Sequence, residues 1–187
     1  MIILEGPDGA GKTTLMNDLL EAFPIDQHER ASTSEGGPVD NIFEWAQADV
    51  ETWTVQPLSF YDRHPVISEP IYGTILRGGY DPKFDSREGQ LLRHKLNWRA
   101  LTIVCLPPVG VVIKNLQSEK QMKGVDDHIF DIYLAYQQRL ITHGEGLPHT
   151  VFHYDYTENE LSEFDDLCEI IEAHMVRWNR KNKGRIA

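Results

Sequence analysis

The sequence predicts an α/β fold in which a parallel sheet of about five strands is flanked by helices. Short apolar runs alternate along the chain with longer segments whose apolar residues recur at helical spacing. A glycine-rich stretch, Gly6–Thr13, follows the first apolar run and leads directly into a helical pattern. The length of 187 residues and the hydrophobic fraction of 41% suit one globular domain over residues 1–187.

The first half of the predicted fold begins with a buried strand and a helix. Ile2–Leu4 is wholly apolar, as expected of a strand that is covered on both faces. Lys12–Ala22 follows as a helix with leucines on one face, and Pro24 ends it. The elements predicted next are a polar loop with one short strand, an amphipathic helix and a core strand: 26–40, Val39–Trp53 and Leu58–Tyr61.

The second half continues the alternation of helices and strands. Ser68 is predicted as the N-cap of a helix, with Pro70 in its first turn. Pro107 and Pro108 stop a strand over Leu101–Leu106. The remaining predicted elements are helices and one last strand: Ser68–Leu76, Ser86–Arg99, Val109–Lys123, Asp126–His143, Val151–His153 and a terminal helix containing Leu161–Met175.

Gly6–Thr13 matches the pattern GxxxxGK[ST] without a mismatch. Glycines let backbone N–H groups approach phosphate oxygens without a Cβ in the way, and the following helix adds the partial positive charge of its N-terminus. In this motif Lys12 reaches the β- and γ-phosphates and the Thr13 hydroxyl binds Mg²⁺. ATP and Mg²⁺ are therefore the predicted cofactors. The predicted nucleotide-binding residues are Gly6, Pro7, Asp8, Gly9, Ala10, Gly11, Lys12, Thr13 and Thr14.

The loop by itself indicates NTP binding, and GTPases, ATPases and kinases share it. No NKxD guanine signature occurs in the sequence, which counts against a GTPase. Asp62 and Arg63 directly follow the strand Leu58–Tyr61, at the edge where a doubly wound sheet gathers its ligands. An acid there can hold Mg²⁺ or take a proton, and an arginine neutralises phosphate charge during transfer. Asp62 is thus predicted as a second metal ligand beside Thr13, and a kinase is favoured.

Residues 5–14, which read EGPDGAGKTT, resemble the opening of thymidylate kinases, and Asp62–Arg63 matches a dipeptide of that family. Tyr72 is offset by one position from the family's tyrosine. The resemblance implies a P-loop kinase fold and transfer of the γ-phosphate of ATP to a deoxynucleoside monophosphate. It also implies that Asp8 faces the acceptor sugar and that Arg63 contacts the acceptor phosphate. The predicted catalytic residues are Lys12, Asp62, Arg63 and Asp8.

The chain departs from thymidylate kinases in two places. Their Arg-Glu-Pro motif after the second strand is missing, and Arg30 is the candidate replacement for its arginine. A lid-like segment, 114–125, offers lysines where the family has arginines. The runs 63–73 and 121–125 are more similar to bacteriophage relatives, some of which phosphorylate deoxynucleoside monophosphates. Others phosphorylate the hydroxymethyl group of 5-hydroxymethyluracil in DNA, which is the alternative function. A non-catalytic nucleotide-binding module is a more remote alternative.

The acceptor side has several candidate residues. A hydroxyl acceptor would benefit from a general base, and the sequence leaves open whether Asp62, Asp8 or Glu69 takes that role. Tyr72 is a candidate for stacking on the acceptor base. The full set of predicted acceptor-binding residues is Arg30, Arg63, Glu69, Tyr72 and Arg93.

The overall charge bears on partners and location. Acidic residues outnumber basic ones 29 to 18, and a net charge of −11 repels nucleic acid. A DNA contact would need the basic tail, 177–187, which carries five positive charges and no acid. Two cysteines without CxxC spacing, no charged leader and no apolar stretch of membrane length predict a cytoplasmic protein without a membrane partner. The expected partner is a nucleotide acceptor, and a homodimer is left open.

Overall fold

The computed structural model describes residues 1–28, 37–52, 58–117, 123–144, 150–158 and 160–183. In this part of the chain five parallel strands form one sheet in the order β2-β3-β1-β4-β5. The strands are β1 (Ile2–Glu5), β2 (Asp26–Gln27), β3 (Ser59–Asp62), β4 (Leu101–Cys105) and β5 (Val151–Tyr154). The predicted α/β fold with a five-stranded parallel sheet is therefore confirmed.

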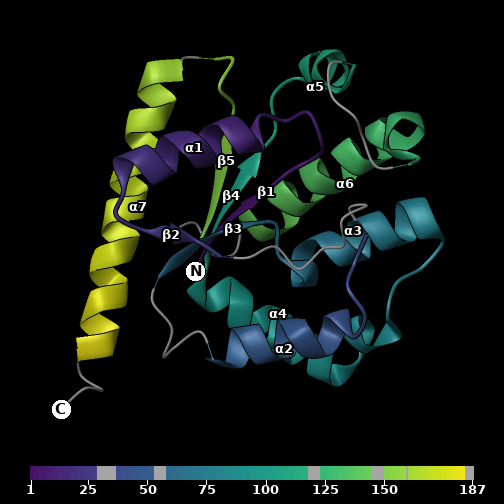
Figure 1. The fold of residues 1–187 in the computed structure, drawn as a ribbon, viewed down its shortest axis with the longest axis horizontal. Coiled ribbons are helices and arrows are strands. Elements are labelled where there is room, and N and C mark those ends of the chain that lie inside the picture. The colour runs from purple at the N-terminus through teal and green to yellow at the C-terminus, as the bar shows by residue number, and fades with distance from the viewer. Residues whose placement is uncertain (29–36, 53–57, 118–122, 145–149, 159, 184–187) are drawn as a thin grey trace.

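Helices cover both faces of the sheet. They are α1 (Lys12–Ala22), α2 (Ile42–Thr52), α3 (Pro65–Arg77), α4 (Arg87–Arg99), α5 (Val109–Leu116), α6 (Val125–Gly144) and α7 (Glu160–Lys183), with a short 3₁₀ helix at Pro82–Asp85. Figure 1 shows α1 and α7 on one side of the sheet and α3 and α6 on the other. None of the helices in these residues is both long and apolar enough to cross a membrane.

The core lies around the two central strands. Every residue of β1 and β4 is buried, as expected for parallel strands that are covered on both faces. The helix predicted over Asp126–His143 is present as α6, and its Ile132 and Tyr136 are fully buried. The register pairs Leu4 of β1 with Asp62 of β3. The carboxyl ends of these two strands therefore lie side by side.

The predicted start of α3 is wrong by one turn. Ser68 was expected to be the N-cap, but the helix begins at Pro65 and His64 is its cap. The His64 ring accepts a hydrogen bond from the backbone N–H of Val66, and Pro65 suits the first helical position because its fixed φ is already helical. Pro70 consequently lies inside the helix, beyond its first turn.

Other helix ends also differ from the prediction, and α2 begins at Ile42 instead of Val39. The helix predicted over Val109–Lys123 ends at Leu116, with Gln117 as its C-cap, and residues 118–122 lie outside the described residues. By contrast, α7 continues through the basic residues Arg177 and Arg180 to Lys183, since cations are favourable near a helix C-terminus.

Candidate functional site

The phosphate-binding loop leaves β1 at the carboxyl edge of the sheet and turns on three glycines with positive φ. Gly6, Gly9 and Gly11 have φ of 136°, 75° and 80°. A Cβ at Gly6 would lie 2.3 Å from the carbonyl oxygen of Cys105, and a Cβ at Gly9 would lie 2.7 Å from that of Val112. Both backbone conformation and close packing therefore restrict these positions to glycine.

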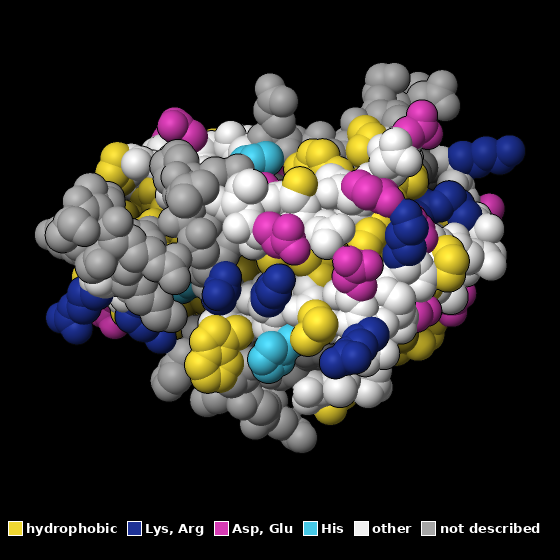
Figure 2. All heavy atoms as spheres, turned by 90° about the horizontal axis from the view of Figure 1, so that it is seen from below, with side chains coloured by type: hydrophobic (Ala, Val, Ile, Leu, Met, Phe, Trp, Pro, Cys, Tyr) yellow, Lys and Arg dark blue, Asp and Glu magenta, His cyan; other side chains and the backbone are white. Residues whose placement is uncertain are grey.

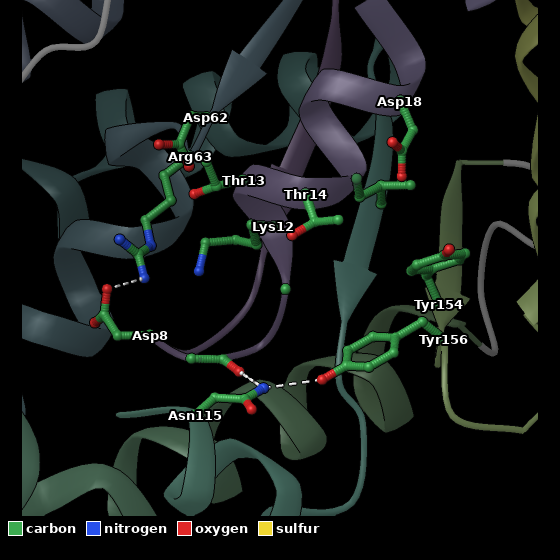
Figure 3. A pocket seen from close by; sticks show the side chains of 13 residues that line it. Asp8, Lys12, Thr13, Thr14, Asp18, Asp62, Arg63, Asn115, Tyr154 and Tyr156 are labelled. Carbon is green, nitrogen blue, oxygen red and sulfur yellow. Dashed lines mark hydrogen bonds and ion pairs between the residues drawn. The ribbon is translucent and has the colours of Figure 1, made fainter. Parts of the chain in front are cut away.

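A cavity of about 400 Å³ opens over this loop. Figure 3 shows Lys12, Thr13, Thr14, Asp62 and Arg63 around it, with Asp8 on one side and Tyr156 on the other. The lining residues are Asp8, Gly9, Gly11, Lys12, Thr13, Thr14, Leu15, Asp18, Asp62, Arg63, Asn115, Tyr154 and Tyr156. The four predicted catalytic residues thus border one cavity. Of the predicted nucleotide-binding residues, Gly6, Pro7 and Ala10 lie in the loop but do not line it.

Lys12 is nearly buried within the loop. Its Nζ donates a hydrogen bond to the Pro7 carbonyl oxygen at 2.6 Å. Burial, followed by the positive charge of Arg63, lowers the pKa of Lys12 to about 8, although the carboxylates of Asp8 and Asp62 oppose this shift. The site therefore holds a concentrated positive charge that a polyanion would stabilise.

Arg63 lines the cavity directly after β3. Its backbone has φ of 64°, in the left-handed region, and its N–H donates to the Leu4 carbonyl oxygen at 2.9 Å. Its Nη2 donates to Asp8 Oδ1 at 2.9 Å, to the Tyr72 hydroxyl at 2.7 Å and to the Gly6 carbonyl oxygen at 3.1 Å. The buried Nε has no hydrogen-bond partner among the described residues. A buried guanidinium with a donor still available is suited to bind an anionic oxygen.

Asp8 and Tyr72 complete this cluster. The Tyr72 hydroxyl donates to Asp8 Oδ2 at 2.8 Å. Burial alone would raise the pKa of Asp8, but the Arg63 guanidinium and the Lys12 ammonium hold that pKa well below its ordinary value. Burial also raises the pKa of Tyr72 well above its usual range. At neutral pH the cluster therefore contains a carboxylate, a guanidinium and a protonated phenol.

A buried network beneath the cluster fixes the turn at Arg63. Glu5, at the end of β1, is fully buried and accepts hydrogen bonds from the His64 N–H and the Tyr136 hydroxyl, each at 2.8 Å. Burial raises the pKa of Glu5. On the other side of His64, its Nε2 lies 3.3 Å from Asp49 Oδ2. The turn that carries Arg63 is thus tied to β1, α2 and α6.

The residues at the cavity fit a Mg²⁺ ion that is shared with nucleotide phosphates. The predicted ligands Thr13 and Asp62 both line the cavity beside Lys12. Oxygen donors of this kind are what Mg²⁺ prefers, and the ion usually takes only one or two protein ligands when substrate phosphates supply the others. As metal ligands, both residues stay predictions.

The remaining acceptor candidates are more scattered. Glu69 is paired with Arg77 on α3 and does not line the cavity. Arg93 donates to the Phe84 carbonyl oxygen at 3.1 Å and lies 3.9 Å from Asp85, also outside the lining. Arg30 and the lid-like residues 118–122 lie outside the described residues. Of the five candidates, the structure brings Arg63 and Tyr72 together with Asp8.

Sequence reasoning missed the side of the cavity formed by Asn115, Tyr154 and Tyr156. The sequence indicates Asn115 only as one residue of the lid-like segment 114–125, because an asparagine inside a helical pattern belongs to no motif. Tyr156 comes two residues after β5, and the rule that ligands gather at the carboxyl ends of parallel strands would have indicated it.

Comparison with solved structures identifies chains of similar fold. YorR from Bacillus subtilis, in complex with phosphorylated GDP, superposes with a TM-score of 0.64 at 20% identity, over 91% of this chain and 95% of that one. Deoxyadenosine kinase from M. mycoides with bound dATP gives a TM-score of 0.60 at 11% identity, over 91% and 98% of the two chains. Thymidylate kinase from Candida albicans gives 0.55 at 17% identity, over 93% and 91%.

Comparison at the level of sequence, by contrast, finds no match. No protein-family model matches the chain, and no curated protein matches its sequence. Structural similarity at such low identity demonstrates a shared fold, and the P-loop kinase fold predicted from the sequence is thereby confirmed. The chain has the fold of P-loop nucleotide kinases.

Proposed function

We propose that this chain is a nucleotide kinase of thymidylate-kinase type, which uses ATP and Mg²⁺ to phosphorylate a deoxynucleoside monophosphate. The observation that carries the proposal is the single cavity bordered by Lys12 and Thr13 of the phosphate-binding loop and by Asp62 and Arg63 after β3. The proposal assigns Lys12 and Thr13 to the donor and Arg63 to the acceptor, and all three border the same space of about 400 Å³.

The donor half of the reaction is assigned to the loop. Its backbone N–H groups and Lys12 would hold the β- and γ-phosphates, and Thr13 and Asp62 would hold the metal ion. When bound, Mg²⁺ neutralises the charge that develops on the transferred phosphoryl group and its leaving oxygen. Lys12 adds a positive charge on the same phosphates from the floor of the cavity.

The acceptor half is assigned to Arg63, Asp8 and Tyr72. The Arg63 guanidinium, whose Nε has no partner among the described residues, would bind a phosphate oxygen of the acceptor. The Asp8 carboxylate would accept a hydrogen bond from a sugar hydroxyl. A phosphate oxygen of the acceptor attacks the γ-phosphorus, and the bond from that phosphorus to the β–γ bridging oxygen breaks. ADP leaves, and no general base is needed because the attacking oxygen is already ionised.

The test offers γ-labelled ATP with Mg²⁺ and two sets of acceptors. One set contains free deoxynucleoside monophosphates and nucleosides, and the other contains DNA with and without 5-hydroxymethyluracil. We expect label in a deoxynucleoside diphosphate. The variant Lys12→Ala should lose transfer, whereas Lys95→Ala, which removes an exposed lysine of α4, should keep it.

Other outcomes would each contradict the proposal in a specific way. Label that appears only in modified DNA would establish the DNA-kinase alternative. ATP binding without transfer to any acceptor would indicate the non-catalytic module. Full transfer by Lys12→Ala would overturn the assignment of the site.

A further inference from the structure

The last turn of α5 lies against the phosphate-binding loop, where one side chain joins three segments. Asn115 Nδ2 donates to the Gly9 carbonyl oxygen and to the Tyr156 hydroxyl, each at 2.9 Å (Figure 3). An amide NH₂ group has two protons, so both hydrogen bonds form together. Gly9 belongs to the loop and Tyr156 follows β5. Asn115 therefore ties the loop to α5 and to the carboxyl end of β5.

Backbone packing reinforces these hydrogen bonds at two glycines of the loop. A Cβ at Gly11 would lie 2.9 Å from Tyr156 Cε1, so the tyrosine ring rests directly on the backbone of Gly11. A Cβ at Gly9 would lie 3.1 Å from Leu116 Cγ of α5. The loop is thus held from outside at both glycines that follow Asp8, and both have positive φ.

Such support matters because the loop is rich in glycine. Glycine has more backbone freedom than any other residue, and a phosphate-binding loop must hold several N–H groups toward one anion. If the loop becomes ordered only when the ligand binds, the loss of its conformational entropy weakens the binding free energy. Contacts that order the loop beforehand therefore strengthen phosphate binding without touching the ligand.

We propose that Asn115 and Tyr156 are positioning residues that form a clamp on Gly9 and Gly11 and keep the loop in its phosphate-binding conformation. The proposal rests on the proposed function in taking the ligand of the loop to be the polyphosphate chain of a nucleotide. The clamp acts through the loop. It should therefore affect every polyphosphate ligand equally, whether or not that ligand carries a nucleoside.

The test compares binding of ATP and of inorganic tripolyphosphate, measured by calorimetry, for Tyr156→Phe, Asn115→Ala and the double variant. Loss of one neutral hydrogen bond should raise the Kd of both ligands about three- to tenfold. The Kd values of the double variant should be no higher than those of Asn115→Ala, because that substitution already removes both hydrogen bonds of the clamp. In the transfer assay, the KM for the acceptor should stay unchanged.

Two matched controls separate the clamp from general effects of substitution. Asn179→Ala removes an exposed asparagine of α7, and Tyr80→Phe removes a hydroxyl that bonds Asp85 outside the cavity. Both should bind the two ligands like the wild type. Tyr156→Phe keeps the ring on Gly11, so it tests the proposal even where circular dichroism shows that Asn115→Ala does not fold.

Three results would overturn the clamp: unchanged Kd values for both ligands, a loss of affinity for ATP alone, or losses of affinity that add up in the double variant. A loss confined to ATP would mean that Tyr156 contacts the nucleoside. A wild-type protein that binds neither ligand would overturn the proposed function together with the clamp. Wild-type binding that all three variants retain would overturn the clamp alone.

Discussion

At the scale of single residues, the site depends on charges that are buried next to one another. Besides burial, the positive charge of Arg63 lowers the pKa of Lys12, whereas the carboxylate of Asp8 raises it. The same two cations lower the pKa of Asp8. Burial makes each of these interactions stronger than it would be in water. The protein therefore carries a pair of cations and a carboxylate that are poised to respond to an incoming phosphate.

The depressed pKa of Lys12 predicts that ATP binding takes up protons. In the free protein this pKa is about 8, and a bound polyphosphate favours the charged ammonium, which raises the pKa again. Affinity for ATP should therefore fall as the pH rises above about 8. Calorimetry at about pH 8.5 in buffers of different ionisation enthalpy should show proton uptake on binding. Lys12→Arg, which stays charged, should abolish that uptake, and equal uptake by this variant would contradict the assignment.

A second residue-scale prediction concerns the Tyr72 hydroxyl. It accepts from Arg63 and donates to Asp8, so Tyr72→Phe leaves both side chains less constrained. Hydrogen bonds to charged groups contribute about 1.5–3 kcal/mol, and we expect the KM for the acceptor to rise at least about tenfold. The KM for ATP should change little. Steady-state kinetics check this, with Tyr80→Phe as the control, and an unchanged acceptor KM would remove Tyr72 from the acceptor side.

At the scale of elements, α3 carries Tyr72 and begins directly after Arg63 and His64. Its cap, His64, is fully buried, and its Nδ1 accepts from the Val66 N–H. The proton of the ring therefore lies on Nε2, which faces Asp49 of α2. Tyr72 projects from the same helix two turns later. A single buried imidazole thus sets where α3 starts and how it meets α2.

This cap predicts a stability that depends on pH. Burial lowers the pKa of His64 below 6.5, although Asp49 opposes the shift. The unfolded chain therefore takes up a proton at this residue that the folded protein excludes, and stability is lost as the pH falls below about 6.5. Urea unfolding at pH 7.5 and at pH 5.5 should show a loss of at most about 1.4 kcal/mol from this group. His64→Asn, which can still cap, should reduce the difference, and an identical difference would refute the role of His64.

At the scale of the whole molecule, the distribution of charge supports the proposal that the acceptor is a free nucleotide rather than DNA. The chain carries a net charge of −11. On the face formed around α2 and α4, shown in Figure 2, basic side chains lie among acidic ones, as in the pairs Lys83–Glu44 and Lys95–Glu51. The basic residues at the end of α7 lie at the opposite end of that helix from the carboxyl edge of the sheet (Figure 1).

We therefore predict that duplex DNA binds weakly and with a steep dependence on salt. Fluorescence anisotropy with labelled DNA at about 50 and about 200 mM NaCl measures it, and near-complete loss of binding at the higher concentration is expected. Replacing Arg177 and Arg180 by Ala should leave transfer to free nucleotides unchanged, since both lie on α7 away from the cavity. Tight binding that persists at high salt would contradict this view of the acceptor.

How much of this was predictable depends on how far apart the interacting residues lie in the sequence. The loop from Gly6 to Thr13 could be predicted in detail, because glycine φ values and the adjacent helix N-terminus are local properties. Asp62 and Arg63 followed from the rule that places ligands at the carboxyl ends of parallel strands. The helix over Lys12–Ala22 matched its predicted bounds for the same local reasons.

Tertiary structure decided the rest. The start of α3 depends on the buried imidazole of His64, whose partner Asp49 lies on another helix. Glu5 and Tyr136 meet only because the sheet and α6 bring together two residues that are 131 positions apart in the sequence. Asn115 reaches Gly9 and Tyr156 in the same way. Local sequence determines backbone conformation and the chemistry of contiguous motifs, whereas pairings between distant side chains depend on packing, which no short stretch of sequence encodes.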